Sequence, residues 1–168
     1  MFNFTKIEIK HFINMKQRCC VYNSPLGWLE FKTEADKLVA LHFVDQPETK
    51  DHSLTPFENE IVKQLNAYFD KKKYHFNFPL AIEGTRFQKK IWEILTQIPK
   101  GSTASYLKVA QQYGNPQAVR AVARAIGKNP LLVIIPCHRV IGSDGSLIGY
   151  SGDISKKKAL LAHEGYLR

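Results

Sequence analysis

A cysteine, a histidine and an arginine follow one another directly after an apolar segment, and together they could support nucleophilic chemistry. Cys137, His138 and Arg139 come after Pro136 and the apolar run 131–135. A thiol attacks as its thiolate. Because a free cysteine has a pKa of about 8.5, it needs a cationic or proton-accepting neighbour to form the thiolate at neutral pH. The alternative is a small buried cysteine that only packs. The two polar neighbours favour a reactive site.

Adjacency alone does not make Cys137 and His138 a catalytic pair. In an extended segment, successive side chains point to opposite faces, so His138 would not face the thiol. Contact would then require a water molecule or a rotated turn. The residues by themselves leave both interpretations of Cys137 open.

The elements that must position this group fall into two halves of different charge. Residues 1–80 contain 11 Lys and Arg against 10 Asp and Glu, and residues 81–168 contain 13 against 5. Nearly all of the net charge of +9 therefore belongs to the second half. Such a basic half is typical of nucleic-acid binding, although it can also be merely well solvated.

The first half shows the pattern of a small sheet with one helix. Segments 18–23, 26–33 and 37–44 are rich in aromatic and aliphatic residues and are separated by turn residues, which predicts an antiparallel meander. In 55–71, apolar residues recur at i, i+4, i+7 and i+8, which predicts an amphipathic helix packed on that sheet. Residues 1–14 are interpreted as an extension without an assigned function.

The second half shows a helical pattern. A capping box from Thr85 to Gln88 begins a helix that ends before Pro99. Segments 105–113 and 117–126 then predict two helices joined by a very tight turn, which is the spacing of a helix-turn-helix.

Arg120 and Arg124 lie four residues apart on the second of these two helices. Four of its other residues are alanines, which keep its surface shallow and would let the helix approach a nucleic-acid groove closely and present guanidinium groups to it. The alternative is a solvated arginine face. The charge of the second half favours nucleic acid.

The composition argues against membrane and secreted classes. No apolar run approaches the roughly 20 residues of a membrane helix, and no secretory signal is evident. Three cysteines, of which Cys19 and Cys20 are neighbours, do not suggest a disulfide framework. We expect a cytoplasmic protein with no membrane contact.

Four motifs in a fixed order resemble the O6-alkylguanine-DNA alkyltransferases, also called methylated-DNA–protein-cysteine methyltransferases. They are Asn129-Pro130, Ile135-Pro136-Cys137-His138-Arg139-Val140, Gly149-Tyr150-Ser151-Gly152 and Leu160-Leu161-Ala162-His163-Glu164-Gly165. The resemblance covers nearly all of residues 85–168 and is looser in the first half. It implies an α+β protein: a ribonuclease-H-like domain over 1–80, with a small antiparallel sheet and a helix, and a mostly helical, winged-helix-like domain over 81–168 that contains the helix-turn-helix.

The resemblance also implies the activity. The expected reaction is DNA repair by irreversible, single-turnover transfer of a methyl or alkyl group from O6-alkylguanine, and from O4-alkylthymine, to Cys137. The damaged nucleotide would have to leave the duplex and enter a pocket. We expect a monomer that binds double-stranded DNA through the minor groove. No cofactor is expected, because no glycine-rich nucleotide loop is present and the alkyl group comes from the DNA.

By the same resemblance, individual residues receive roles. Cys137 matches the nucleophile, and His138 and Glu164 match the pair coupled to it, the histidine through a water molecule. Asn129 matches the residue that braces the active-site turn, and Arg139 is expected to support local structure.

On the DNA side, Arg120 matches the finger that fills the gap left by the flipped nucleotide. Tyr106 matches the residue that crowds the adjoining phosphate and contacts the flipped base. Tyr150 and Ser151 match the wall of the base pocket, with Ser151 contacting the oxygen that loses its alkyl group. Further DNA contacts are expected from Arg124 and Lys157.

The chain departs from the family pattern at two places. Asp153 stands where many members have glycine; it could cap a helix that begins near Ile154, and its carboxylate would weaken phosphate contacts. Some relatives bind zinc in the first half, but adjacent Cys19 and Cys20 with scattered histidines form no convincing tetrahedral set, so we expect no metal.

Three other classes of protein compete with this interpretation. A lesion-binding module of the alkyltransferase-like type would have Trp in place of Cys137. A sequence-specific helix-turn-helix regulator would dimerise and read base edges, for which the alanine-rich helix offers few side chains. A cysteine hydrolase would need an oxyanion site and a separately placed base, and neither is evident.

Overall fold

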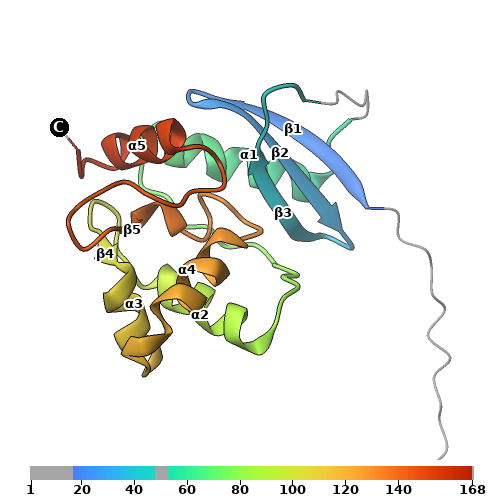
Figure 1. Cartoon of the computed structure of the whole chain (residues 1–168). Coiled ribbons are helices and arrows are strands. Elements are labelled where there is room, and N and C mark those ends of the chain that lie inside the picture. Colours follow the sequence, from blue (N-terminus) through green and yellow to red (C-terminus); the bar gives the residue numbers. More distant parts are fainter. Residues whose placement is uncertain (1–16, 48–52, 168) are drawn as a thin grey trace, which may run out of the picture.

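The computed structural model describes residues 17–47 and 53–167, so the expected extension over residues 1–14 lies outside the described part. A three-stranded antiparallel sheet with a helix is followed by a mostly helical second half (Figure 1). This is the α+β class that the sequence predicts. Among the described residues, no helix is long and apolar enough to cross a membrane.

The sheet is the predicted meander. Strands β1 (Arg18–Ser24), β2 (Gly27–Glu34) and β3 (Lys37–Phe43) pair in chain order, each antiparallel to the next. Residues alternate along β1 and β2 between buried and more exposed positions, as a sheet with one covered face requires.

Helix α1 (Pro56–Phe69) follows the sheet and begins with a complete capping box. The Thr55 side chain accepts from the Glu58 N–H, and the Glu58 carboxylate accepts from the Thr55 N–H. The same carboxylate binds Arg18 of β1 at 2.7 Å and Thr33 of β2 at 2.9 Å, so the start of α1 is tied to two strands.

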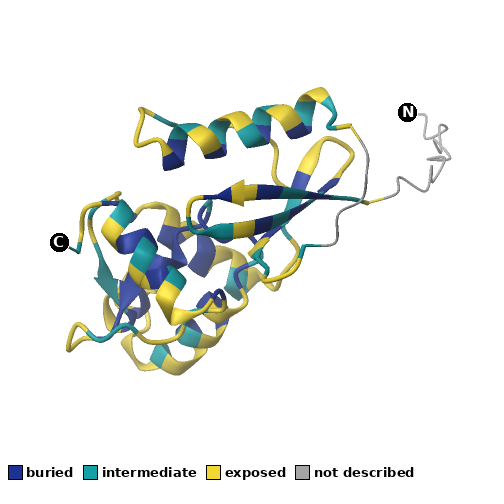
Figure 2. Cartoon of the chain, turned by 90° about the horizontal axis from the view of Figure 1, so that it is seen from above, coloured by how far each residue is buried: buried dark blue, intermediate teal, exposed yellow. Residues whose placement is uncertain are grey.

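The second half contains four α-helices and two very short strands. They are α2 (Arg86–Thr96), α3 (Tyr106–Tyr113), α4 (Val119–Gly127), α5 (Ile154–His163), β4 (Ala104–Ser105) and β5 (Val140–Ile141). β4 and β5 pair in parallel, which the sequence did not predict. Figure 2 shows buried residues concentrated where these helices meet and on one face of the sheet.

Three helices of the second half pack through specific contacts. The buried Trp92 of α2 donates its indole N–H to the carbonyl of Ala125 in α4 at 2.8 Å. Helix α3 ends at Gly114 in the left-handed conformation, and Asn115 caps the short 3-10 turn Pro116–Ala118 that runs directly into α4. The tight turn between the two helices is therefore present.

Most of the apolar run 131–135 is buried, as the sequence predicts, but its backbone is not extended. Ile135 N–H donates to the Leu131 carbonyl at 2.9 Å, and Val133 has φ = 73°, a backbone conformation that a β-branched residue rarely adopts. The start of the run is fixed to β3, where Leu41 exchanges backbone hydrogen bonds with Pro130 and Leu132. The second half thereby holds its reactive segment against the first-half sheet.

Candidate active site and DNA-binding surface

The cysteine is delivered by two tight turns. Pro136 has φ = −80° and ψ = 59°, and Cys137 N–H donates to the Ile135 carbonyl at 2.7 Å, which is the geometry of an inverse γ-turn. A single turn of 3-10 helix, Cys137–Arg139, follows. With three residues per turn, the three polar side chains point in different directions. All three are buried.

Asn129 connects this turn to the thiol. Its side-chain N–H₂ donates to the Ile135 carbonyl at 2.8 Å and to Cys137 Sγ at 2.9 Å, and its side-chain oxygen accepts from Leu131 N–H at 2.9 Å. All of these groups are buried. Asn129 can therefore fix the loop and offer a donor to a developing thiolate.

Glu164 is the hub of the polar network. His138 Nε2 lies 3.0 Å from Oε1, and Arg139 donates to Oε2 from Nε at 2.8 Å and to Oε1 from Nη2 at 2.7 Å. Arg139 also donates to the Ile98 carbonyl at 2.6 Å. Tyr68, from α1 in the first half, donates its hydroxyl to Oε1 at 2.9 Å.

Burial sets the protonation states of this network. Burial raises the pKa of Cys137 to about 11, although the Asn129 hydrogen bond and the charge of Lys157 favour the thiolate. Burial lowers the pKa of His138 against the opposing pull of Glu164. Burial alone would raise the pKa of Glu164, but hydrogen bonds from His138 and Arg139 outweigh it and hold that pKa well below its usual range. At neutral pH the site holds a thiol, a neutral imidazole and a carboxylate.

One nitrogen of His138 remains available for proton transfer. Nδ1 is buried and has no hydrogen-bond partner within the protein, whereas Nε2 faces Glu164. If Nε2 donates its proton to the carboxylate, Nδ1 carries the lone pair that can accept another. The acidity of the thiol and the basicity of this nitrogen are thus the two quantities that govern the site.

A pocket of about 600 Å³ opens beside this network. Its walls come from α3, α4 and the 142–151 loop: Tyr106, Leu107, Val119, Arg120, Ala123, Gly127, Gly142, Ser143, Ile148, Gly149, Tyr150 and Ser151. Four of the expected DNA-side residues therefore line one pocket.

The two tyrosines of this pocket are placed differently. Tyr106 is buried, and its hydroxyl lies 3.0 Å from the Ile148 carbonyl and 3.2 Å from that of Gly149. A side chain at position 149 would place its Cβ 2.8 Å from that hydroxyl, so the close approach requires glycine. The hydroxyl of Tyr150 is buried with no protein hydrogen-bond partner. Burial raises the pKa of both tyrosines, and the nearby Cys137 raises it further.

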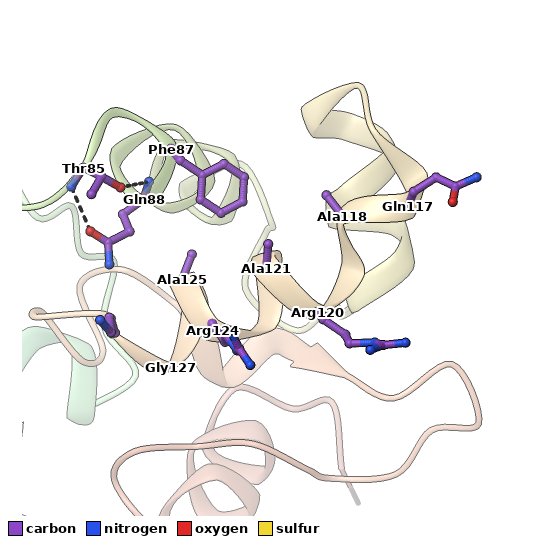
Figure 3. A pocket seen from close by; sticks show the side chains of 11 residues that line it. Thr85, Phe87, Gln88, Gln117, Ala118, Arg120, Ala121, Arg124, Ala125 and Gly127 are labelled. Atoms are coloured by element: carbon purple, nitrogen blue, oxygen red, sulfur yellow. Dashed lines mark hydrogen bonds between the residues drawn. The ribbon is translucent and has the colours of Figure 1, made fainter.

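A second pocket of about 930 Å³ lies between α4 and the start of α2. It is lined by Thr85, Phe87, Gln88, Gln117, Ala118, Arg120, Ala121, Arg124, Ala125, Gly127 and Lys128, none of which is acidic. Figure 3 shows Phe87 of α2 pointing toward Ala121 of α4, while Arg120 extends outward from the helix. Arg120 and Gly127 of α4 line both pockets, so the two pockets share α4 as a wall.

Lys157 does not lie where we expected. Its side chain is fully buried, and Nζ donates to the carbonyls of Val140 and Ile148, each at 2.6 Å. Burial lowers its pKa to about 8. In this conformation the ammonium group is bound inside the protein, so a DNA contact from Lys157 would require it to leave these two carbonyls.

Asp153 caps α5, as the sequence predicts. Its carboxylate accepts from Ser155 N–H at 2.7 Å. The residue has φ = 74° and ψ = 144°, a region that only glycine adopts without strain. The glycine of many family members at this position therefore has a backbone explanation.

The position of the Tyr68 hydroxyl beside Glu164 is not predictable from the sequence. Tyr68 belongs to the apolar stripe of the predicted helix, and no local pattern marks its hydroxyl as a partner of Glu164. Residues 68 and 164 are 96 positions apart, and only the folded chain brings them together.

Two known protein-family domains match the sequence of this chain. The 6-O-methylguanine DNA methyltransferase ribonuclease-like domain matches residues 18–82, and the DNA binding domain of the same family matches residues 86–166.

Individual relatives agree with these matches. A methylated-DNA–protein-cysteine methyltransferase of Mycobacterium tuberculosis is 42% identical over 148 residues, which cover 84% of this chain and 88% of the relative. The constitutive enzyme of that name from Bacillus subtilis is 40% identical over 146 residues, covering 82% and 88%. A crystal structure of the M. tuberculosis protein OGT in complex with DNA superposes with a TM-score of 0.76 at 41% identity, covering 86% of this chain and 90% of that one.

Proposed function

The chain belongs to the 6-O-methylguanine DNA methyltransferase family, and from this premise we propose a role for each residue of its site. The protein binds DNA and repairs it by transferring methyl groups from methylated bases to a cysteine of its own. We propose that Cys137 is this cysteine. The main support is that the Cys137 thiol is buried, accepts a hydrogen bond from Asn129 and is adjacent in the chain to His138, which pairs with Glu164.

In the proposed reaction the Cys137 sulfur attacks the methyl carbon on O6 of guanine. The S–C bond forms as the C–O6 bond breaks. The thiol proton passes through a water molecule to Nδ1 of His138, while Glu164 stabilises the resulting imidazolium. The departing guanine takes up one proton, so the overall reaction is proton-neutral. A thioether has no ordinary leaving reaction, and each molecule therefore acts once.

We propose that the pocket of about 600 Å³ receives the damaged base. A base in the duplex stack cannot reach a buried thiol, so the nucleotide must flip out at a cost of a few kcal/mol. Arg120, which lines both pockets, would fill the gap in the stack. Tyr106, Tyr150 and Ser151 would contact the flipped base, with Tyr106 also crowding the adjoining phosphate.

The acid-free pocket beside α4 supports a DNA-binding surface. We propose that α3 and α4 act as a helix-turn-helix that lies in the minor groove, with Arg124 contacting the backbone. The protein would act as a monomer on O6-alkylguanine and O4-alkylthymine. Residues 1–80 and 81–168 would form two domains, the second of which holds the acceptor cysteine and the DNA surface.

The test is a mass measurement on the reacted protein. Incubation with a duplex that carries O6-methylguanine should add one methyl group to the tryptic peptide 129–139, and Cys19 and Cys20 should stay unmodified. The variant Cys137→Ser should bind the duplex without repairing it. Repaired DNA with an unmethylated Cys137 would exclude it as the acceptor, and unrepaired DNA with wild-type protein would exclude the function.

A further inference from the structure

The active-site carboxylate receives one of its hydrogen bonds from the other half of the chain. Glu164 Oε1 accepts from His138, from Arg139 and from the hydroxyl of Tyr68 at 2.9 Å. The first two residues belong to the second half, whereas Tyr68 lies near the end of α1. The first half therefore reaches into the polar network that the mechanism uses.

We propose that Tyr68 is a positioning residue for alkyl transfer: its hydroxyl fixes the Glu164 carboxylate in the orientation in which it binds His138. The inference rests on the roles proposed above for His138 and Glu164. Tyr68 itself touches neither the thiol nor the base pocket in the described structure, so it acts through Glu164.

The tyrosine is held so that its hydroxyl has little freedom. Its ring is fully buried, stands edge-on to Tyr74 with centroids 4.9 Å apart, and lies tilted against His163 at 5.0 Å. Its backbone carbonyl lies 2.9 Å from His163 Nε2. Tyr68 thus contacts two successive residues, His163 through ring and backbone and Glu164 through its hydroxyl, which fixes the end of α5 relative to α1.

The hydroxyl is chemically suited to this task. Burial and the neighbouring Glu164 raise the pKa of Tyr68 far above its usual value, so it is always a donor and never competes as an anion. A carboxylate oxygen with three donors has its lone-pair directions occupied and cannot rotate without losing one. Arg139 alone would leave the carboxylate free to rock on the guanidinium fork, so its angle to His138 would not be fixed.

Loss of the hydroxyl has a predictable sign at His138. The charged groups that act on His138 are Glu164, Arg139 and Lys157. Glu164 in turn interacts with His138, Arg139, Tyr68, Tyr74 and Tyr150. The O–H dipole of Tyr68 places its positive end on Oε1. Without it the potential at His138 is more negative, the imidazolium is favoured, and the pKa of His138 rises.

The test compares two tyrosine-to-phenylalanine variants. Tyr68→Phe keeps the ring and removes the hydroxyl. Tyr22→Phe is the matched control. The Tyr22 hydroxyl donates to the side chain of Asn66 in α1 at 2.7 Å, so the variant also removes a tyrosine hydrogen bond that involves α1, but not one to Glu164. Both variants should lose similar, small amounts of thermal stability. Methyl transfer is measured under single-turnover conditions with the free base O6-methylguanine, so that DNA binding plays no part.

Tyr68→Phe should react about tenfold more slowly than wild type, the effect of one charge-assisted hydrogen bond. The acid limb of its pH–rate profile, and the NMR titration of the His138 ring, should move upward by about half a pH unit. Tyr22→Phe should match wild type in both. A Tyr68→Phe protein with the wild-type rate and an unmoved acid limb would overturn the proposal, as would a control that shifts equally or a Tyr68→Phe chain that does not fold. Failure of the proposed function is distinct, because wild type itself would then not react.

Discussion

Asn129→Ala tests whether one side chain both braces the reactive turn and activates the thiol. Removing the amide leaves the buried N–H of Leu131 unpaired and takes one of two hydrogen bonds from the C=O of Ile135, which still accepts from Cys137 N–H. The unpaired N–H costs about 1–3 kcal/mol and the lost bond to the Ile135 carbonyl about 0.5–1.5 kcal/mol, so the free energy of unfolding should fall by about 1.5–4.5 kcal/mol. The variant also removes the donor 2.9 Å from Cys137 Sγ. A hydrogen bond to a charged group contributes about 1.5–3 kcal/mol, so the population of the Cys137 thiolate should fall by roughly 10- to 100-fold.

Two measurements separate these effects. Urea unfolding measures the loss of stability. The loss of reactivity is measured as the single-turnover rate on a duplex with O6-methylguanine, in buffer without urea and at a temperature where both proteins are folded. Asn66→Ala is the control, because it removes an amide that binds the Tyr22 hydroxyl far from the thiol. It should lower stability and leave the rate unchanged. A wild-type rate for folded Asn129→Ala, or an equal slowing in Asn66→Ala, would refute the assignment.

Three further outcomes are expected. Arg120→Ala should slow repair of a duplex while leaving the reaction with the free base at the wild-type rate; equal losses on both substrates would contradict the finger role. Because burial lowers the pKa of His138 and raises that of Cys137 to about 11, the logarithm of the free-base rate should be flat between about pH 6.5 and 7.5, below the range where Lys157 titrates. A tenfold rise per pH unit there would mean that a free thiolate is required. Asp153→Gly should raise the free energy of unfolding by about 1 kcal/mol, since relief of about 1–3 kcal/mol of backbone strain exceeds the few tenths lost with the cap; a lower urea midpoint would speak against this balance.

Elements with a strong local pattern were predictable. The meander follows from alternation and turn residues, and the capping box at Thr85 begins α2 at the expected residue. The start of α4 was also close to its place, because Asn115 and Pro116 signal a helix start by their own chemistry. In each of these cases the information lies within a few residues.

The path of 131–135 and the state of Lys157 were not predictable in the same way. β-branched residues favour extended backbone, yet Val133 adopts φ = 73° because tertiary contacts to β3 and Asn129 determine the local path. Lysine is usually exposed, and the partners of the buried Lys157 ammonium, the carbonyls of Val140 and Ile148 and the ring of Tyr106, are brought together by folding. The family resemblance supplied the Glu164 partnership of His138, which the spacing could not.

The hydrogen bond between Trp92 and Ala125 gives the protein an internal optical reporter. The chain has two tryptophans, one in each half. Trp92 is 3% exposed and bound to the carbonyl of α4, whereas Trp28 on β2 is 37% exposed. In Trp28→Phe, the remaining indole would emit from a buried site in which it is hydrogen-bonded to the backbone of α4. Any strain that DNA places on that helix would then appear as a change in the wavelength or intensity of emission, without a label on either molecule.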